Sequence, residues 1–70
     1  MFTVEDKGMW GLYIHFPKVN GKYVIPTDMK VWLDNIYENV RWTRTSNGCR
    51  KYVALDFIED KAEFKRKFGT

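Results

Sequence analysis

Hydrophobic residues alternate with polar or small residues between positions 10 and 16 of this chain. The apolar positions of this segment are Trp10, Leu12, Ile14 and Phe16. A period of two places successive side chains on opposite sides of an extended backbone. The pattern therefore predicts a strand over 10–16 with one buried face, and it places Tyr13 and His15 on the other face.

A tight turn follows this strand. The Asn-Gly pair at 20–21 supplies two residues that adopt positive φ readily, as a type I′ turn requires. The turn predicts a short return strand over 23–25. The register that follows pairs Val19 with Lys22, Pro17 with Val24 and Phe16 with Ile25. Since proline donates no ladder hydrogen bond, we expect an edge position or a bulge at Pro17.

The next segment has helical periodicity. Its apolar residues lie three or four positions apart and form one stripe: Met29, Trp32, Leu33, Ile36, Tyr37 and Val40. Thr27 or Asp28 can cap the free amides of the first turn, and Asn39 can end the helix in a left-handed conformation. The stripe predicts a helix that packs against a sheet.

A second Asn-Gly pair, at 47–48, separates strands predicted over 40–45 and 50–57. A two-residue loop places Ser46 opposite Cys49 and sets the register of the hairpin. The predicted pairs are Thr45–Arg50, Arg44–Lys51, Thr43–Tyr52, Trp42–Val53, Arg41–Ala54 and Val40–Leu55. The buried face then holds Val40, Trp42, Val53, Leu55 and Phe57. The water-facing side holds Arg41, Thr43, Thr45, Arg50, Tyr52 and Ala54.

The last segment has the charge order of a helix, with acidic residues before basic ones. Glu59, Asp60 and Glu63 precede Lys65, Arg66 and Lys67, while Ala62, Phe64 and Phe68 can pack inward and Gly69 marks the end. The element order ββαββα predicts an α+β fold in one domain, 1–70. We expect a two-layer sandwich with an antiparallel or mixed sheet of about four strands and helices on one face.

Charge is distributed unevenly along the chain. Residues 1–40 hold four Lys or Arg against five Asp or Glu, whereas residues 41–70 hold eight against four. Segment 41–51 carries four cations and no carboxylate. A one-sided positive field is what a surface for polyanions needs. Arginines at a hairpin tip also prevent strand-to-strand aggregation, which accounts for one or two of the four.

The chemistry of catalysis is poorly represented. His15 is the only histidine and Cys49 the only cysteine, so neither a zinc ligand cluster nor a nucleophilic triad can be assembled. We therefore predict no enzyme, no cofactor and no metal. A lone cysteine fits a reducing compartment, no apolar run approaches the roughly 20 residues of a membrane span, and no signal-peptide pattern is present. These features predict a soluble cytoplasmic protein.

The candidate binding residues come from the predicted water-facing side of the sheet and from the basic hairpin. Aromatic rings beside arginine on a sheet face can stack unpaired bases while cations hold phosphates. The last helix extends this surface if it lies beside the hairpin; the alternative is that its cations only complement the helix dipole. The candidates are Arg41, Thr43, Arg44, Arg50, Lys51, Tyr52, Tyr13, His15, Lys65 and Arg66.

The end of the chain contains the run Tyr52-Val53-Ala54-Leu55-Asp56-Phe57, followed by Asp60, Ala62, Phe64-Lys65 and Phe68-Gly69. This segment resembles a pattern frequent in small accessory proteins of tailed bacteriophages. Here Asp60 and Phe64 are closer than in that pattern, and Arg66 replaces a leucine. The resemblance implies an α+β protein of the host cytoplasm that blocks a host enzyme, a restriction or CRISPR complex, or a toxin.

Three functions follow as hypotheses. The first is a non-enzymatic phage-type protein that grips nucleic acid, as RNA or a single strand, while inhibiting a host or defence system. The second is a pure protein inhibitor without nucleic acid, anchored by an aromatic or arginine side chain. The third is a small homo-oligomeric assembly protein, which open sheet edges would permit.

Overall fold

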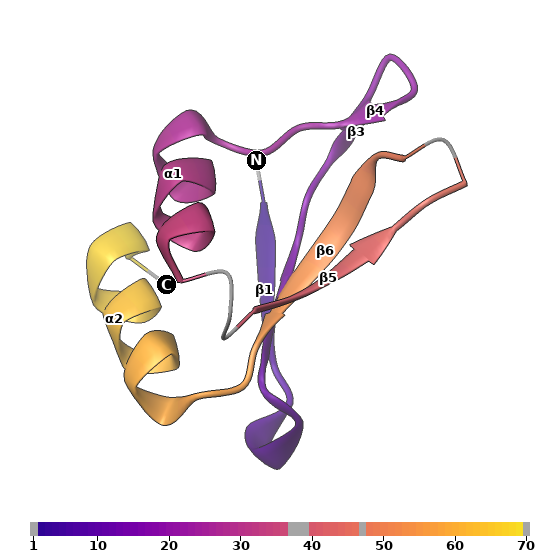
Figure 1. The fold of residues 1–70 in the computed structure, drawn as a ribbon. Coiled ribbons are helices and arrows are strands. Elements are labelled where there is room, and N and C mark those ends of the chain that lie inside the picture. Colours follow the sequence, from indigo (N-terminus) through magenta and orange to yellow (C-terminus); the bar gives the residue numbers. More distant parts are fainter. Residues whose placement is uncertain (1, 37–39, 47, 70) are drawn as a thin grey trace.

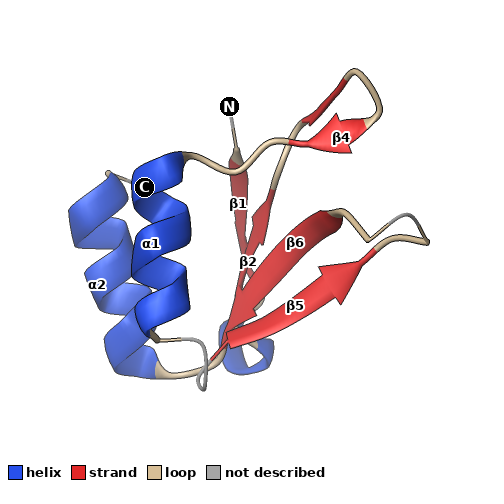
Figure 2. Ribbon diagram, turned by 45° about the horizontal axis from the view of Figure 1, so that its top comes forward, coloured by secondary structure: helices blue, strands red, loops and turns tan. Residues whose placement is uncertain are grey.

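The computed structural model of this chain describes residues 2–36, 40–46 and 48–69. The elements are β1 (Thr3–Asp6), a 3-10 helix η1 (Gly8–Trp10), β2 (Leu12–His15), β3 (Lys18–Val19), β4 (Lys22–Tyr23), α1 (Thr27–Asn35), β5 (Val40–Arg44), β6 (Arg50–Leu55) and α2 (Ile58–Phe68). Both helices cover one face of the sheet, and the two hairpins project from its far end (Figures 1 and 2). The predicted two-layer α+β sandwich is confirmed.

The main sheet has the order β1-β2-β6-β5, with every neighbouring pair antiparallel. Its membership differs from the prediction, because β1 occupies one edge and β3 and β4 form a separate two-stranded sheet. Strand β2 ends at His15, shortly before Pro17, which has no amide hydrogen to offer a ladder. The element order is therefore ββββαββα.

The first hairpin has the predicted register. Val19 pairs with Lys22, and the backbone amide of Val24 donates to the carbonyl of Pro17 at 2.9 Å. Both turn residues have positive φ, 51° at Asn20 and 79° at Gly21. The return strand covers Lys22–Tyr23 and is shorter and earlier than the predicted 23–25.

The core forms between the helices and the facing side of the sheet. Its fully buried side chains are Leu12, Ile14, Met29, Leu33, Val53, Leu55 and Phe64, with Phe16 and Trp32 almost as enclosed. This confirms the inward face of β2 and the stripe of α1. Helix α1 ends at Asn35, so Val40 belongs to β5 instead; Tyr37 and Asn39 lie outside the described residues.

Three predicted core positions are wrong. Trp10 is exposed because the chain leaves the sheet before it and forms η1. Phe57 is exposed because β6 ends at Leu55 and Phe57 serves as the N-cap of α2. Ala62 lies on the outer side of α2, whereas Phe64 packs inward as expected.

The ends of the helices agree largely with the sequence. In α1 the N-cap is Pro26 and no side chain caps from that position, but the Asp28 carboxylate accepts a hydrogen bond from the Met29 amide at 2.9 Å. Helix α2 begins with acidic and ends with basic residues, and Gly69 closes it in a left-handed conformation.

The second hairpin follows the predicted register for most of its length and then departs from it. Pairs from Val40–Leu55 to Thr43–Tyr52 are confirmed, but a bulge follows and Arg44 faces Arg50. The amide of Thr45 donates to the carbonyl of Cys49, so the loop has three residues, 46–48, and the predicted partners of Ser46, Thr45 and Arg44 are wrong. Lys51 is the extra residue of the bulge, and its carbonyl accepts a hydrogen bond from Phe16 of the neighbouring chain segment.

Candidate nucleic-acid interface

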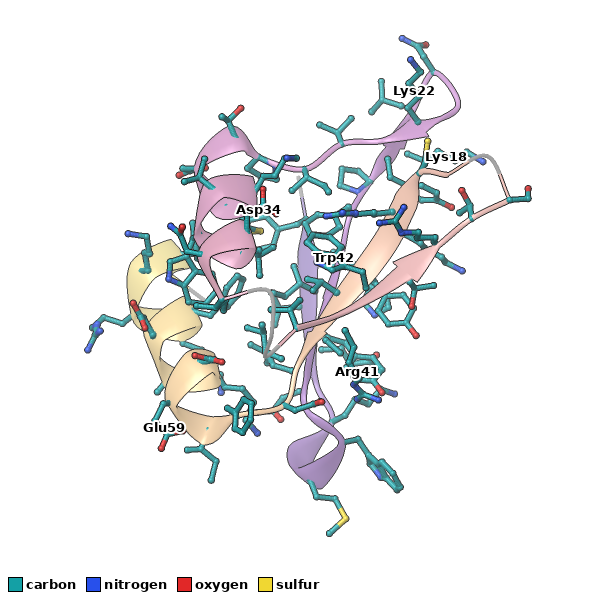
Figure 3. All side chains as sticks on the ribbon, viewed as in Figure 1. Lys18, Lys22, Asp34, Arg41, Trp42 and Glu59 are labelled. Carbon is teal, nitrogen blue, oxygen red and sulfur yellow. The ribbon has the colours of Figure 1, made fainter. Side chains whose placement is uncertain are left out.

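Two hairpins project at one end of the molecule, and the charged residues in their described parts are all cations. The described parts of segments 16–25 and 43–51 contain no carboxylate, and we call their cations the basic end: Lys18, Lys22, Arg44, Arg50 and Lys51. Figure 3 shows Lys18 and Lys22 on the upper hairpin, while Asp34 and Glu59 lie on the distant helices. Acidic and basic groups are thus separated along the molecule.

Backbone pairing brings the two hairpins together. The amide of Phe16 donates to the carbonyl of Lys51 at 3.1 Å, so the first hairpin starts where the tip of the second begins. Both hairpins extend away from the helices in two views (Figures 1 and 2). Cations far apart in sequence therefore share one end of the protein.

The cations of the basic end have no carboxylate partner among the residues that the structure describes. Elsewhere Lys7, Lys30, Arg41 and Lys65 each form an ion pair with a carboxylate at 2.9–3.3 Å. Within the described residues, none of the five cations of the basic end forms such a pair. A partner can therefore approach these charges without breaking an ion pair among the described residues.

Arg50 is held by aromatic rings in place of a carboxylate. Its guanidinium carbon lies 4.1 Å from the centroid of Trp42, which itself stacks on Phe16 with the centroids 6.2 Å apart. One terminal nitrogen, Nη1, is shielded from solvent and has no hydrogen-bond partner among the described residues. This corrects the predicted position of Arg50, because the bulge turns it from the Tyr52 side of the sheet to the Trp42 side.

The face of the sheet opposite the helices carries an aromatic cluster, which we call the ring cluster: Tyr13, His15 and Tyr52. Tyr13 and Tyr52 stack with centroids 5.4 Å apart and planes within 16°, and His15 lies 5.2 Å from Tyr52. All three side chains are half-buried, and the predicted gathering of these rings is confirmed. Thr43 pairs with Tyr52 across the sheet and lies beside the cluster, as predicted.

Arg41 lies near the ring cluster, but its charge is already compensated. Its Nε and Nη2 atoms contact the two carboxylate oxygens of Asp56, both at 2.9 Å, and Nη2 also donates to the carbonyl of Trp10 at 3.3 Å. The Asp56 carboxylate raises the pKa of Arg41 above its ordinary value. Arg41 therefore ties β5 to the chain before β2, a structural contact that sequence reasoning missed.

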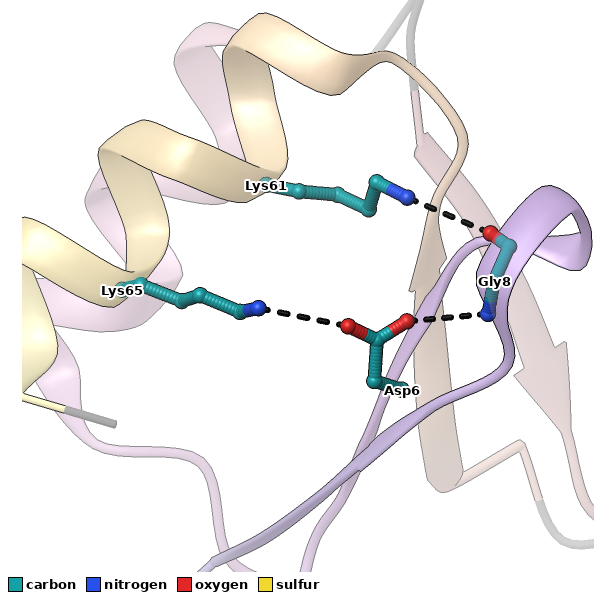
Figure 4. A network of polar contacts seen from close by, with 4 residues as sticks. All are labelled: Asp6, Gly8, Lys61 and Lys65. Carbon is teal, nitrogen blue, oxygen red and sulfur yellow. Dashed lines mark hydrogen bonds and ion pairs between the residues drawn. The ribbon is translucent and has the colours of Figure 1, made fainter.

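The cations of α2 do not extend the basic end. The helix lies away from the hairpin tips (Figure 1) and packs on the core-bearing face of the sheet, whereas the rings of the cluster alternate with the core residues and lie on the other face. Lys65 contacts Asp6 at 3.2 Å and Lys61 donates to the carbonyl of Gly8 at 3.2 Å (Figure 4). The Gly8 amide and then the Lys65 ammonium lower the pKa of Asp6. Arg66 is exposed in the last turn of this helix, separate from the hairpins.

Sequence reasoning missed Lys18 and Lys22 as members of the surface. A signal for them existed, because no Asp or Glu occurs between Asp6 and Asp28, nor between Glu38 and Asp56. Each hairpin lies within one of these acid-free segments. Counting the charged residues of each hairpin separately, instead of those of each half of the chain, would have identified both hairpins as basic.

Three further features of the described residues concern metal ligands, hollows and membrane-spanning helices. No group of three or more His, Cys, Asp or Glu side chains that could hold a metal occurs in the described residues. A hollow of about 340 Å³ between the helices is lined by Asp28, Val31, Trp32, Asn35 and Lys67, remote from the basic end. No described helix has the length and apolar character needed to cross a bilayer.

Comparisons with protein-family models, with curated proteins and with solved structures found no match to this chain.

Proposed function

We propose that this protein is a non-enzymatic binding protein whose basic end grips nucleic acid, with RNA or another single strand as its ligand. The observation that carries the proposal is the set of five cations on two neighbouring hairpins, without ion pairs among the described residues. Phosphate contacts by such cations release condensed counterions and supply affinity that does not depend on sequence.

The arrangement of Arg50 supports phosphate binding over general solubility. A guanidinium stacked on Trp42 is fixed in orientation, so less side-chain entropy is lost when it binds. Its planar fork of N–H donors matches the oxygens of a phosphate. An arginine that served only to keep a strand edge soluble would gain nothing from being packed on an indole.

The ring cluster supports a single strand over a duplex. Tyr52 follows Lys51 directly, so the rings begin where the basic end stops. Stacking of an unpaired base on an aromatic side chain contributes about 1–3 kcal/mol, and bases in a duplex are not available for it. A strand held at the hairpins can thus place its bases on Tyr52 and His15.

The resemblance to small accessory proteins of tailed phages supports a biological setting for this binding. In that setting the protein acts in the host cytoplasm, and nucleic-acid binding serves to inhibit a host or defence system. The proposed role as an inhibitor rests on the resemblance, whereas the proposed binding of nucleic acid rests on the basic end and the ring cluster.

Binding is tested by fluorescence anisotropy with labelled single-stranded RNA, single-stranded DNA and duplex DNA at two salt concentrations. We expect single strands to bind more tightly than duplex. Arg44→Gln with Lys51→Gln should lower affinity, whereas the matched pair Arg66→Gln with Lys67→Gln on α2 removes equal charge and should leave it unchanged. Absence of binding to all three probes, or equal losses in both double variants, would reject the proposal and favour a pure protein inhibitor.

A further inference from the structure

Large apolar side chains are exposed at the end of the sheet opposite the hairpin tips. The exposed fraction is 90% for Met9, 67% for Trp10, 51% for Phe57 and 76% for Ile58. We call these four residues the apolar end. The 3-10 helix that bears Met9 and Trp10 and the start of α2 lie at this end, away from both hairpins (Figures 1 and 2).

Specific contacts join the two segments that supply these side chains. Lys61 of α2 donates to the carbonyl of Gly8, and Arg41 bridges the carbonyl of Trp10 to the carboxylate of Asp56. Gly11 packs so closely that a Cβ there would lie 2.7 Å from the carbonyl oxygen of Leu55. The apolar end is therefore held in place by the fold.

The apolar end is comparable in area to the largest apolar patch of a typical monomer. With roughly 150–250 Å² for a large side chain, the exposed fractions correspond to roughly 400–700 Å² of apolar surface. The largest apolar patch on a typical monomer covers about 300–600 Å² and is often functional. A standard interface buries about 800 Å² on each partner, so this patch with its rim is large enough for one.

The charges around the apolar end favour a second copy of the chain as the occupant. The exposed or half-buried charged groups beside it in sequence or through the contacts of this region comprise four cations and four carboxylates: Lys7, Arg41, Lys61, Lys65, Glu5, Asp6, Asp56 and Glu59. A neutral rim with both signs can meet itself without net repulsion, as the self-complementary interface of a two-fold dimer requires. The basic end, in contrast, would repel its own copy and attract polyanions.

We propose that two copies of this chain associate through their apolar ends in a two-fold dimer, with Trp10 and Ile58 at the centre. The basic ends then point away from each other. The dimer does not depend on the proposed nucleic-acid binding. If that binding holds, the two basic ends of one dimer contact two stretches of the same strand, and joining them raises the overall affinity.

Sedimentation velocity of the full chain over a wide range of concentration tests the dimer. We expect the wild type to be dimeric at high concentration, and Trp10→Glu to raise the dissociation constant roughly thirtyfold or more. Ile58→Glu should do the same; it lies exposed on α2, so it preserves the test if Trp10→Glu does not fold. Val31→Glu is the control, because Val31 is 57% exposed on α1, outside the patch.

Circular dichroism identifies which variants are folded. A wild type that stays monomeric at every concentration would overturn the proposal and indicate a different protein as the occupant. A dimer that persists in both folded variants would also overturn it, because association would then use another surface, such as a strand edge.

Discussion

Arg50 illustrates how one inserted residue decides which partner a side chain meets. Strict alternation from Val53 predicts Arg50 beside Tyr52, on the water-facing side. The bulge at Lys51 brings two residues opposite one and turns Arg50 onto Trp42. The guanidinium stacks on Trp42, forms no ion pair among the described residues, and is a fixed anchor at the basic end.

Replacing Arg50 by lysine distinguishes the contribution of its positive charge to binding from that of its planar, stacked guanidinium. Arg50→Lys keeps the cation but loses the planar group stacked on Trp42, so we expect affinity for a single-stranded RNA to fall roughly fivefold to tenfold. Anisotropy titrations measure this, with Lys22→Arg as a control that should not weaken binding. Unaltered affinity in Arg50→Lys would mean that the stacked guanidinium contributes only its charge.

Asp6 links stability to pH. Its pKa in the folded protein lies below the ordinary value of 3.8 because the Gly8 amide and the Lys65 ammonium stabilise the carboxylate. The stabilisation is complete above the unfolded pKa and is lost as pH falls through the folded pKa. We expect Asp6→Asn to melt at a lower temperature than the wild type near neutral pH, with the difference disappearing in acid. A constant difference across the titration would contradict this.

At the scale of elements, helices and strands with a clear hydrophobic period were predictable from the sequence, whereas elements without such a period were not. The alternation of β2 and the stripe of α1 each reflect one buried face, so the sequence specified them. Strand β1 contains one apolar residue, Val4, among polar neighbours, and it forms through backbone pairing to β2 that leaves no period in the sequence. The bulge is a choice between hairpin loops of two and three residues, which an Asn-Gly pair does not settle.

The predictability of each candidate binding residue likewise depended on whether its neighbouring elements had a clear hydrophobic period. Tyr13, His15 and Tyr52 follow from alternation on paired strands and were predictable. The contacts of Arg41 with the Trp10 carbonyl and of Lys65 with Asp6 depend on where η1 and β1 lie, and neither element was predicted. Side chains whose partners come from unpredicted elements cannot be assigned roles from sequence alone.

The junction between η1 and β2 depends on the absence of a side chain at Gly11. Its φ of 109° is strained for other residues, and a Cβ would meet the Leu55 carbonyl, which is backbone and cannot move aside cheaply. We expect Gly11→Ala to lower the free energy of unfolding by about 3 kcal/mol in urea titrations. Gly21→Ala, with a φ of 79° but open space around it, should cost only about 1 kcal/mol. Equal losses would show that the close approach at Gly11 is unimportant.

The proposed binding of unpaired bases to the ring cluster can be tested by removing its rings. Tyr13→Leu and Tyr52→Leu remove stacking surface without changing charge, so each should weaken binding of single-stranded RNA roughly tenfold while duplex binding stays the same. The control is Phe57→Leu, which removes an exposed ring that belongs to neither the ring cluster nor the basic end and should leave binding unchanged. Equal losses for single and double strands would argue that these rings act only through the stability of the sheet, which thermal melts would reveal.

At the scale of the whole molecule, the fold separates carboxylates from uncompensated cations more completely than the order of charges along the sequence indicates. Carboxylates gather on the helices, on β1 and near η1, where lysine or arginine neutralises several of them, while the hairpins keep their cations uncompensated within the described residues. The chain therefore has a modest net charge of +3 but one strongly positive end. Such polarity orients a polyanion toward the hairpins before contact is made.

If both hairpins engage the same strand, the salt dependence of binding must count their cations together. Five phosphate contacts to a single strand predict a log-log slope of affinity against salt of about −3.5. Lys18→Gln with Lys22→Gln on the first hairpin should reduce the slope to about −2, and so should Arg44→Gln with Lys51→Gln on the second. Combining all four changes should leave about −0.7, since only Arg50 remains. If instead the first pair leaves the slope unchanged while the second reduces it, the strand contacts one hairpin only, and the shared basic end has no functional meaning.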